Sequence, residues 1–312
     1  MKYYVKKIAG FLVTLFLVSA VTFSVFQILP GDPALVILGT DADPVQIENL
    51  HKSLDLDHPA VIRYFKWVGG VLHGDFGTSY RYKQPVTAII GPAFGVTSKL
   101  AVLALIITAV LGIPCGIWLA LHDSSPLSIP ASIVAQAGVS VPSFCAAVFF
   151  IIIFSVKLKL FPSMGYIQWS ADPVQCIRSL ILPAVSLAFG TGAVLSRYTK
   201  SGILSQLDLD YVRTARSKGL PMNRIITGHV LRNSMIPVLT VFGMITAEIF
   251  GGSIIIENVF SLPGLGRLLA GSVSSRDFPL IQGIVLYISA IVVLCNFTVD
   301  MLYPVIDPRI VK

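Results

Sequence analysis

The chain has 312 residues, of which 54% are hydrophobic and 12% are charged, and its mean hydropathy is +0.80. A soluble domain carries about 25% charged residues, so this chain has too few charges to cover a water-exposed surface, and we predict an integral membrane protein in contact with lipid. The net charge of +7 would suit a nucleic-acid-binding protein. The basic residues lie in loops between long apolar runs, however, where charges set the orientation of a membrane protein, so we expect no nucleic-acid partner.

The first apolar run covers residues 9–29 and carries no charge over 21 residues, after a basic start that contains Lys2, Lys6 and Lys7. A cleaved signal peptide would have an apolar core of about 7–15 residues. The longer run therefore predicts a retained first membrane span.

Residues 31–98 are polar, with acidic side chains between recurring apolar ones. This pattern predicts short amphipathic helices on the outer face of the membrane, with Tyr64 and Trp67 at the interface. The His and Asp side chains of the segment have two interpretations. They suit a nickel or zinc site, because imidazole and carboxylate groups bind these ions, or they are ordinary charges on a solvated helix. These side chains are His51, Asp55, Asp57, His58, His73 and Asp75.

Five further apolar runs follow, at residues 100–121, 131–156, 180–196, 234–256 and 281–304. In the run at 100–121, Gly112 and Gly116 allow two helices to approach closely, but Pro114 between them makes a kink an equal alternative. Together with the first run, these predict an all-α integral membrane protein with six transmembrane helices. An even number of spans places both termini on one side of the membrane.

The loop charges predict which side is cytoplasmic. Loops on the side of the termini carry twelve Lys and Arg residues, and the short loops on the other side carry five. Residues 31–98 are left out, because charges in segments longer than about 60 residues do not set the topology. Since Lys and Arg are enriched in cytoplasmic loops, both termini and the basic segment at residues 208–237 are predicted to be cytoplasmic.

The segment at residues 208–237 is predicted to form two short helices. Asp208 or Asp210 is expected to cap the first helix, since an Asp side chain accepts hydrogen bonds from free backbone N–H groups. Gly219 stands where a helix-ending residue takes the left-handed conformation, and Pro221 stops the helix from continuing. A second helix is predicted from Met222, where apolar residues recur at three- and four-residue spacing.

This segment resembles the cytoplasmic coupling loop of bacterial ABC importer permeases, in the branch that imports peptides and nickel. Ala215 and Gly219 match the superfamily motif directly, whereas Arg213 and Thr214 replace its Glu and Ala, as is usual in this branch. The resemblance extends over nearly the whole chain. It rests on ILPGDPA at residues 28–34, DFGTSY at 75–80, YVRTARSKGL at 211–220, HVLRNSMIPV at 229–238, VFSLPGLGRLL at 259–269, RDFP at 276–279 and IDPRIVK at 306–312.

The resemblance implies a permease fold with both termini in the cytoplasm, in the bacterial cell membrane. It implies regions at residues 1–30 (first span), 31–98 (outer loop) and 99–312 (core with five spans), and a coupling loop at 200–233, which we call the basic loop. The implied partners are two ATPase subunits, a homologous second permease and an extracytoplasmic solute-binding protein. The implied substrates are di- and oligopeptides or nickel. The residues implied to couple to the ATPase are Arg213, Ala215, Gly219, Leu220, His229 and Arg232.

Three alternatives compete with this interpretation. An ordinary positively charged cytoplasmic loop would explain the basic loop alone. A secondary transporter would be expected to have inverted repeats and several midplane charges, whereas this sequence has one midplane acid and no clear repeat. A membrane scaffold or sensor without transport is the third.

The chain contains no motif for catalysis or cofactor binding. GxxxxGK[ST], GxSxG and HExxH are all absent, so we expect no enzyme activity, no catalytic residues, no resident metal and no cofactor in this chain. ATP would be bound by separate subunits. The four cysteines show no CxxC spacing and are expected to be packing residues.

Two acidic residues interrupt the apolar runs. Glu248 lies near the middle of the run at 234–256, and Asp300 lies close to the end of the last run. A carboxylate inside a membrane span is costly, so its presence predicts a function. Glu248 is expected either to line the translocation path or to hydrogen-bond a neighbouring helix, and Asp300 to pair helices.

Overall fold

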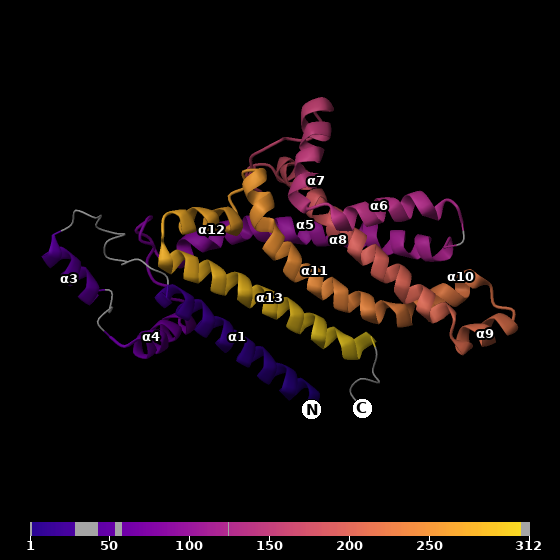
Figure 1. Ribbon diagram of the computed structural model, residues 1–312, viewed down its shortest axis with the longest axis horizontal. Coiled ribbons are helices and arrows are strands. Elements are labelled where there is room, and N and C mark those ends of the chain that lie inside the picture. The colour runs from indigo at the N-terminus through magenta and orange to yellow at the C-terminus, as the bar shows by residue number, and fades with distance from the viewer. Residues whose placement is uncertain (1, 29–42, 54–57, 124, 307–312) are drawn as a thin grey trace. The chain divides into compact units, whose positions relative to one another are not determined.

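The computed structural model describes residues 2–28, 43–53, 58–123 and 125–306. In this part of the chain the regular elements are all helices, apart from an isolated β-bridge between Thr78 and Pro85 (Figure 1). The chain forms two compact units, one of residues 1–96 with 263–294 and one of residues 97–262 with 295–312.

The first unit contains α1 (Lys2–Ile28), α3 (Pro44–Ser53), α4 (Ala60–Leu72), α12 (Leu265–Ser274) and the first parts of α5 (Val86–Leu121) and α13 (Phe278–Ile306). The second unit contains the remainders of α5 and α13 and all the other helices. These are α6 (Ser128–Ser140), α7 (Ser143–Phe150), the π-helix η1 (Ile151–Lys157), α8 (Pro173–Leu207), α9 (Asp210–Ser217), α10 (Met222–Ile225), the π-helix η2 (Ile226–Val230) and α11 (Leu231–Val259).

Five helical segments are long and apolar enough to cross a membrane, and a bent pair provides a sixth. The five are α1, α5, α8, α13 and the continuous segment from α10 to α11. The bent pair is α6 with α7–η1, which meet at 112°. The apolar run at residues 131–156 thus forms two helical segments that meet at a sharp bend. Val141 is extended, with φ −90° and ψ 120°, because the residue before Pro142 is disfavoured in the helical conformation.

Helices α5 and α8 are longer than the apolar runs that predicted them. α5 begins at Val86 and α8 covers Pro173–Leu207. Asp172 caps α8, since its Oδ1 accepts hydrogen bonds from the backbone N–H groups of Val174 (2.9 Å) and Gln175 (3.1 Å). The 35 residues of α8 span about 52 Å, against about 30 Å for the hydrocarbon core of a bilayer. Its last turns therefore extend into the start of the basic loop.

Small residues bring α5 and α8 together in the second unit. A Cβ atom at Gly112 would lie 2.9 Å from the carbonyl oxygen of Gly192, and one at Gly116 would lie closer still to that of Ser196. The hydroxyl groups of Thr108 and Thr191 are hydrogen-bonded at 2.8 Å. The close approach of two helices is therefore confirmed at this pair of glycines, and a kink at Pro114 within the continuous helix α5 stays a prediction.

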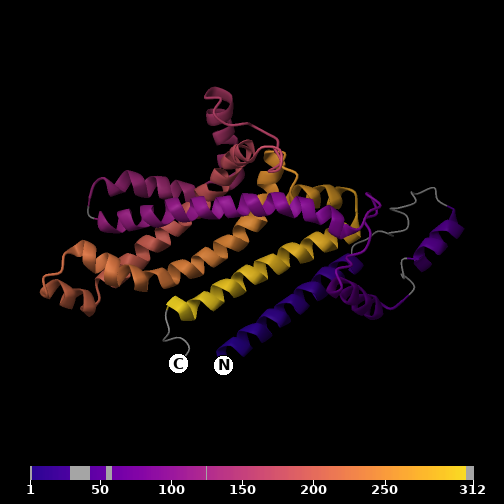
Figure 2. The ribbon, with the colours of Figure 1, turned by 180° about the vertical axis from the view of Figure 1, so that it is seen from behind.

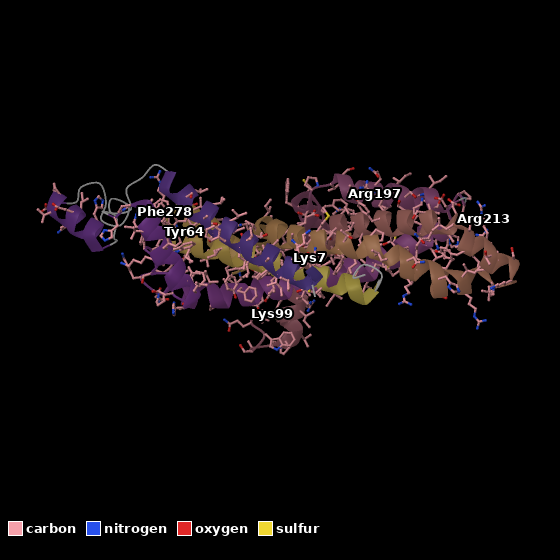
Figure 3. All side chains as sticks on the ribbon, turned by 90° about the horizontal axis from the view of Figure 1, so that it is seen from below. Lys7, Tyr64, Lys99, Arg197, Arg213 and Phe278 are labelled. Atoms are coloured by element: carbon pink, nitrogen blue, oxygen red, sulfur yellow. The ribbon has the colours of Figure 1, made fainter. Side chains whose placement is uncertain are left out.

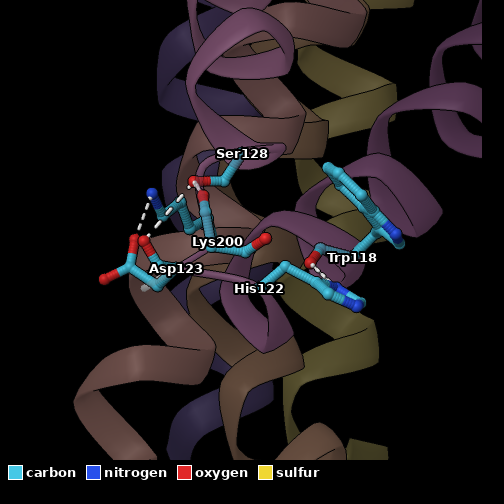
Figure 4. A network of polar contacts seen from close by, with 6 residues as sticks. Trp118, His122, Asp123, Ser128 and Lys200 are labelled. Atoms are coloured by element: carbon cyan, nitrogen blue, oxygen red, sulfur yellow. Dashed lines mark hydrogen bonds and ion pairs between the residues drawn. The ribbon is translucent and has the colours of Figure 1, made fainter.

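An ion pair fixes the turn between α5 and α6 to α8 (Figure 4). Lys200 Nζ on α8 lies 2.6 Å from Asp123 Oδ1 in the turn. His122 stacks on Trp118 with ring centroids 4.8 Å apart, and Ser128 Oγ donates to the carbonyl of Ser125 at 2.8 Å. The turn is thus anchored where α8 enters the basic loop.

In the first unit, α4 packs on α1 through aromatic side chains. Tyr64 is buried, its hydroxyl is hydrogen-bonded to Ser19 Oγ at 2.8 Å, and its ring lies 5.5 Å from that of Phe23. Trp67 lies 5.8 Å from the Phe23 ring. These side chains therefore contact the first span, and their place at the membrane interface stays a prediction.

The outer loop before α5 is held by Asp277, which is fully buried. Its carboxylate accepts hydrogen bonds from Ser79 Oγ (2.5 Å) and from the backbone N–H groups of Tyr80 (3.0 Å) and Arg81 (3.2 Å). Burial, together with the charge of Asp277, raises the pKa of Tyr80 to about 12, so this phenol stays neutral at physiological pH. The DFGTSY and RDFP motifs, about 200 positions apart in the sequence, thus form one structure.

Candidate coupling site

The basic loop forms one end of the second unit. α8 and α11 run side by side, and α9 and α10 lie at the shared end where α8 finishes and α11 begins (Figures 1 and 2). The two short helices predicted from the sequence are therefore present, and the second continues without interruption into the fifth span.

The expected aspartate cap of α9 is wrong. Leu209 occupies the N-cap position in an extended conformation, with no side-chain hydrogen bond to the free N–H groups. Asp208 instead ends α8, in a helical conformation with φ −85° and ψ −9°. Asp210 lies in the first turn of α9, where its negative charge interacts favourably with the positive N-terminal end of the helix. Its carboxylate also lies 3.6 Å from the guanidinium group of Arg213 on the exposed surface.

Gly219 ends α9 as predicted, with φ +76°. The N–H of Leu220 donates to the carbonyl of Ala215 at 3.3 Å, and the N–H of Gly219 donates to that of Arg216 at 2.9 Å. This pair of hydrogen bonds is a Schellman motif, which requires the left-handed conformation at the glycine. No atom would lie within 4 Å of a Cβ at this position, so the restriction on side chains comes from backbone conformation alone.

A small apolar core holds the basic loop together. Val212 and Ala215 of α9 pack with Ile225 and Val230 of the following helical segment, and Leu220 packs against this group. Ile203 of α8 and Ala120 of α5 complete the core. Ala215 thus lies on the inner side of α9, where a small residue lets the helices meet, and Leu220 contacts the same core from the turn after α9.

The outer surface of the basic loop is polar and mostly basic. Arg213, Gly219, His229 and Arg232 are exposed, and Figure 3 shows Arg213 extending from the end of the second unit. The exposed residues that the sequence interpretation did not assign to coupling include Arg216, Ser217, Lys218 and Arg224. Their spacing in a helix with a buried apolar face was the signal that could have identified them.

Glu248 lies apart from the basic loop. It is exposed on α11, sixteen positions after Arg232, which corresponds to about 24 Å along the helix axis. Asp300 is half-buried on α13. The six predicted loop residues therefore all lie within the basic loop, and Glu248 lies outside it.

No cluster in the described residues is suited to a metal ion. There, no three His, Cys, Asp or Glu side chains are close enough to share one. His73 Nδ1 lies 2.8 Å from the carbonyl oxygen of Gly69, and Asp75 Oδ1 accepts a hydrogen bond from the N–H of Gly77 at 2.8 Å. Asp55 and Asp57 lie outside the described residues.

Two family models together match almost the whole sequence. Residues 112–312 match the binding-protein-dependent transport system inner membrane component, and residues 1–101 match the N-terminal model of the same kind of membrane component. The chain belongs to this family of permeases.

Relatives over the full length of the chain agree with this assignment. A protein of Brucella suis biovar 1 (strain 1330), named as a peptide transport system permease, is 41% identical over 305 residues, which cover 98% of this chain and 97% of the relative. The glutathione transport system permease protein GsiC of Escherichia coli (strain K12) is 36% identical over 310 residues, which cover 99% of both chains.

Solved structures share the fold. Two crystal forms of the MetNI methionine ABC transporter in inward-facing conformations match with TM-scores of 0.58 and 0.59. Each match covers 70% of this chain and 97% or 96% of the other, at 15% or 16% identity. At this level of identity the likeness concerns the ABC importer permease fold.

The permease is therefore a multi-pass inner membrane subunit of a binding-protein-dependent ABC importer. It is not an enzyme and holds no cofactor, because ATP is bound by an ATPase partner, and the transport system also includes a binding protein. Membership of this family excludes the secondary transporter and the scaffold or sensor without transport.

Proposed function

We propose that this permease imports peptides, with di- and oligopeptides and glutathione as the substrate class. The observation that carries the proposal is 41% identity over 98% of the chain to a protein named for peptide transport, together with 36% identity over 99% to one named for glutathione. Nickel, the other substrate class of the resembled branch, is named in neither relative.

We propose further that the complex contains two ATPase subunits, a homologous second permease and an extracytoplasmic binding protein. Six spans of one chain would form one half of a translocation path, so a second permease would complete it. The predicted orientation would leave the segment at 31–98 on the side of the binding protein and the basic loop on the side of the ATPases.

The basic loop is proposed to transmit ATP-driven motion to the membrane spans. α9 would dock on the ATPase through its exposed face, with Arg213, His229 and Arg232 in contact and Gly219 giving the loop its shape. Ala215 and Leu220 would keep α9 attached to α10 through the apolar core. Because α10, η2 and α11 form one helical segment of 38 residues, movement of α9 would be passed to the fifth span as a rigid-body displacement.

Uptake by the reconstituted complex tests the proposed substrate class. The permease, with the second permease, ATPases and binding protein encoded beside it, is placed in proteoliposomes that contain ATP, and uptake of trialanine, glutathione and Ni²⁺ is measured. We expect ATP-dependent uptake of trialanine, of glutathione, or of both. Uptake of Ni²⁺ alone would overturn the peptide proposal and leave the family assignment intact.

A further inference from the structure

Between Pro237 and Ile255, the exposed residues of α11 form a single stripe along the helix. All remaining residues of this stretch are buried or half-buried. The stripe has steps of three or four residues, the spacing of one helix face. Its members are Pro237, Thr240, Met244, Glu248, Gly251 and Ile255.

This stripe is not suited to lipid. The exposed residues of α5 in the same unit include Val102, Ile106 and Val110, which are all apolar, as hydrocarbon requires. The α11 stripe instead carries a carboxylate, a hydroxyl group and a glycine. Glu248 lies eleven residues before the outer end of α11, about 16 Å along its axis and so near the middle of a bilayer. A carboxylate at that depth is costly in lipid and typically faces a water-filled cavity or a partner.

The opposite face of α11 is already occupied. Ile245 and Ile249 are buried, and a Cβ atom at Gly252 would lie 3.6 Å from Leu187 of α8. α11 also approaches α13 at Gly243, where a Cβ atom would lie 3.2 Å from Val299. Turning Glu248 inward would therefore expose packed apolar side chains, so the carboxylate stays on the outer face of this unit.

The surface beside Glu248 is open and adaptable. A Cβ atom at Gly251, one turn away, would meet no atom within 4 Å. Met244, one turn away on the other side, is 67% exposed, and methionine adjusts readily to differently shaped partners. A polar group of a passing molecule can thus reach the carboxylate without displacing backbone.

We propose that this stripe lines the translocation path and that Glu248 binds the ammonium group of a peptide as it passes the middle of the membrane. This inference rests on the proposed peptide import, because peptides and glutathione both carry an ammonium group at one end. The attraction exceeds that of the same charges in water, because the path through a bilayer has a lower dielectric constant.

Thiol labelling tests the path independently of the substrate. The four cysteines of this permease are replaced by alanine, and single cysteines are then placed at Met244, Gly251, Ile245 and Ile106. Labelling is measured in the assembled complex. A small, charged methanethiosulfonate reagent is expected to label the cysteines at Met244 and Gly251 at least tenfold faster than the buried control at Ile245 and the lipid-facing control at Ile106. Equal rates at Met244, Gly251 and Ile106 would overturn the inference.

Transport of matched peptides tests the role of the charge. Glu248→Gln is expected to lower uptake of trialanine roughly five- to tenfold, because the carboxylate no longer attracts the ammonium group. Glu248→Asp should restore most of the uptake of trialanine. Uptake of N-acetyl-trialanine, which lacks the ammonium group, should change less than about twofold in Glu248→Gln. Unchanged trialanine uptake in Glu248→Gln, or an equal fall for both peptides, would remove the carboxylate from ammonium binding. Absence of peptide uptake by the wild type would instead refute the proposed function.

Discussion

The basic loop and the outer loop of this permease both carry family signatures, yet different interactions stabilise them. In the basic loop, the turn at Gly219 is closed by backbone hydrogen bonds between residues at most five positions apart. In the outer loop, Ser79, Tyr80 and Arg81 are held by Asp277, which lies almost 200 positions later. The first turn therefore depends on local backbone conformation, and the second depends on a distant charged side chain.

Replacing Gly219 by valine tests the local interaction and should have the largest effect. A β-branched residue at φ +76° adds about 1–3 kcal/mol of strain, which would distort the turn that presents α9 to the ATPase. We expect normal membrane insertion and a loss of more than about tenfold in substrate-stimulated ATP hydrolysis, with Gly219→Ala intermediate.

Gly228→Val is the matched control for this prediction. Gly228 is exposed in the same loop and has nothing within 4 Å of its Cβ position, but its backbone is helical and imposes no left-handed conformation. Stimulation of ATP hydrolysis at the wild-type level in Gly219→Val would show that the shape of the turn does not matter for coupling.

Replacing Asp277 by alanine tests the distant interaction. The substitution leaves buried donors at Ser79 and Tyr80 without an acceptor, which costs about 1–3 kcal/mol for each group that stays unpaired. We expect a melting temperature lower by several degrees in detergent, measured by intrinsic fluorescence. Asp75→Asn, at an exposed carboxylate in the same loop, should leave it nearly unchanged. A melting temperature equal to wild type in Asp277→Ala would show that the hydrogen bonds of Asp277 do not stabilise this loop.

Enlarging Ala215 tests whether the core of the basic loop contributes to coupling. Ala215→Leu overfills the contact between α9 and α10, with a typical cost of about 1–3 kcal/mol. We expect roughly two- to fivefold weaker stimulation of ATP hydrolysis. Thr214→Leu, at the exposed neighbouring position, is the control. An equal loss in both variants would mean that the outer surface of α9, rather than its core, is sensitive.

Cysteine labelling compares the positions of the two loops relative to the membrane. With the native cysteines removed, Ser217→Cys should react only from the cytoplasm and Gln84→Cys only from outside. Both positions are exposed, whereas Ser79 is buried and would not report on topology. The reverse pattern would contradict the orientation predicted from the loop charges.

Several features followed from residues close together in the sequence. The end of α9 at Gly219 was predictable from two neighbouring residues. Glycine readily adopts the left-handed conformation that ends a helix, and Pro221 cannot continue the helix. The number of spans was predictable because each apolar run must satisfy its own backbone hydrogen bonds in a membrane. The break at Val141 also had a local signal in Pro142, although the apolar run concealed it.

Other features depended on the tertiary structure. The sequence did not reveal that Asp277 would bind the loop at Ser79, or that Tyr64 would pack on Phe23, because both contacts join segments distant in the chain. The sequence did not show that Ala215 would be buried in the apolar core of the basic loop, because that core joins residues of α5, α8, α9, α10 and η2. The sequence identified Glu248 as an acidic residue in the middle of a span. Its exposure depends on which face of α11 packs on α8, and only the structure shows that face. That packing is fixed by the fit of side chains between helices, which hydrophobic periodicity along one helix does not determine.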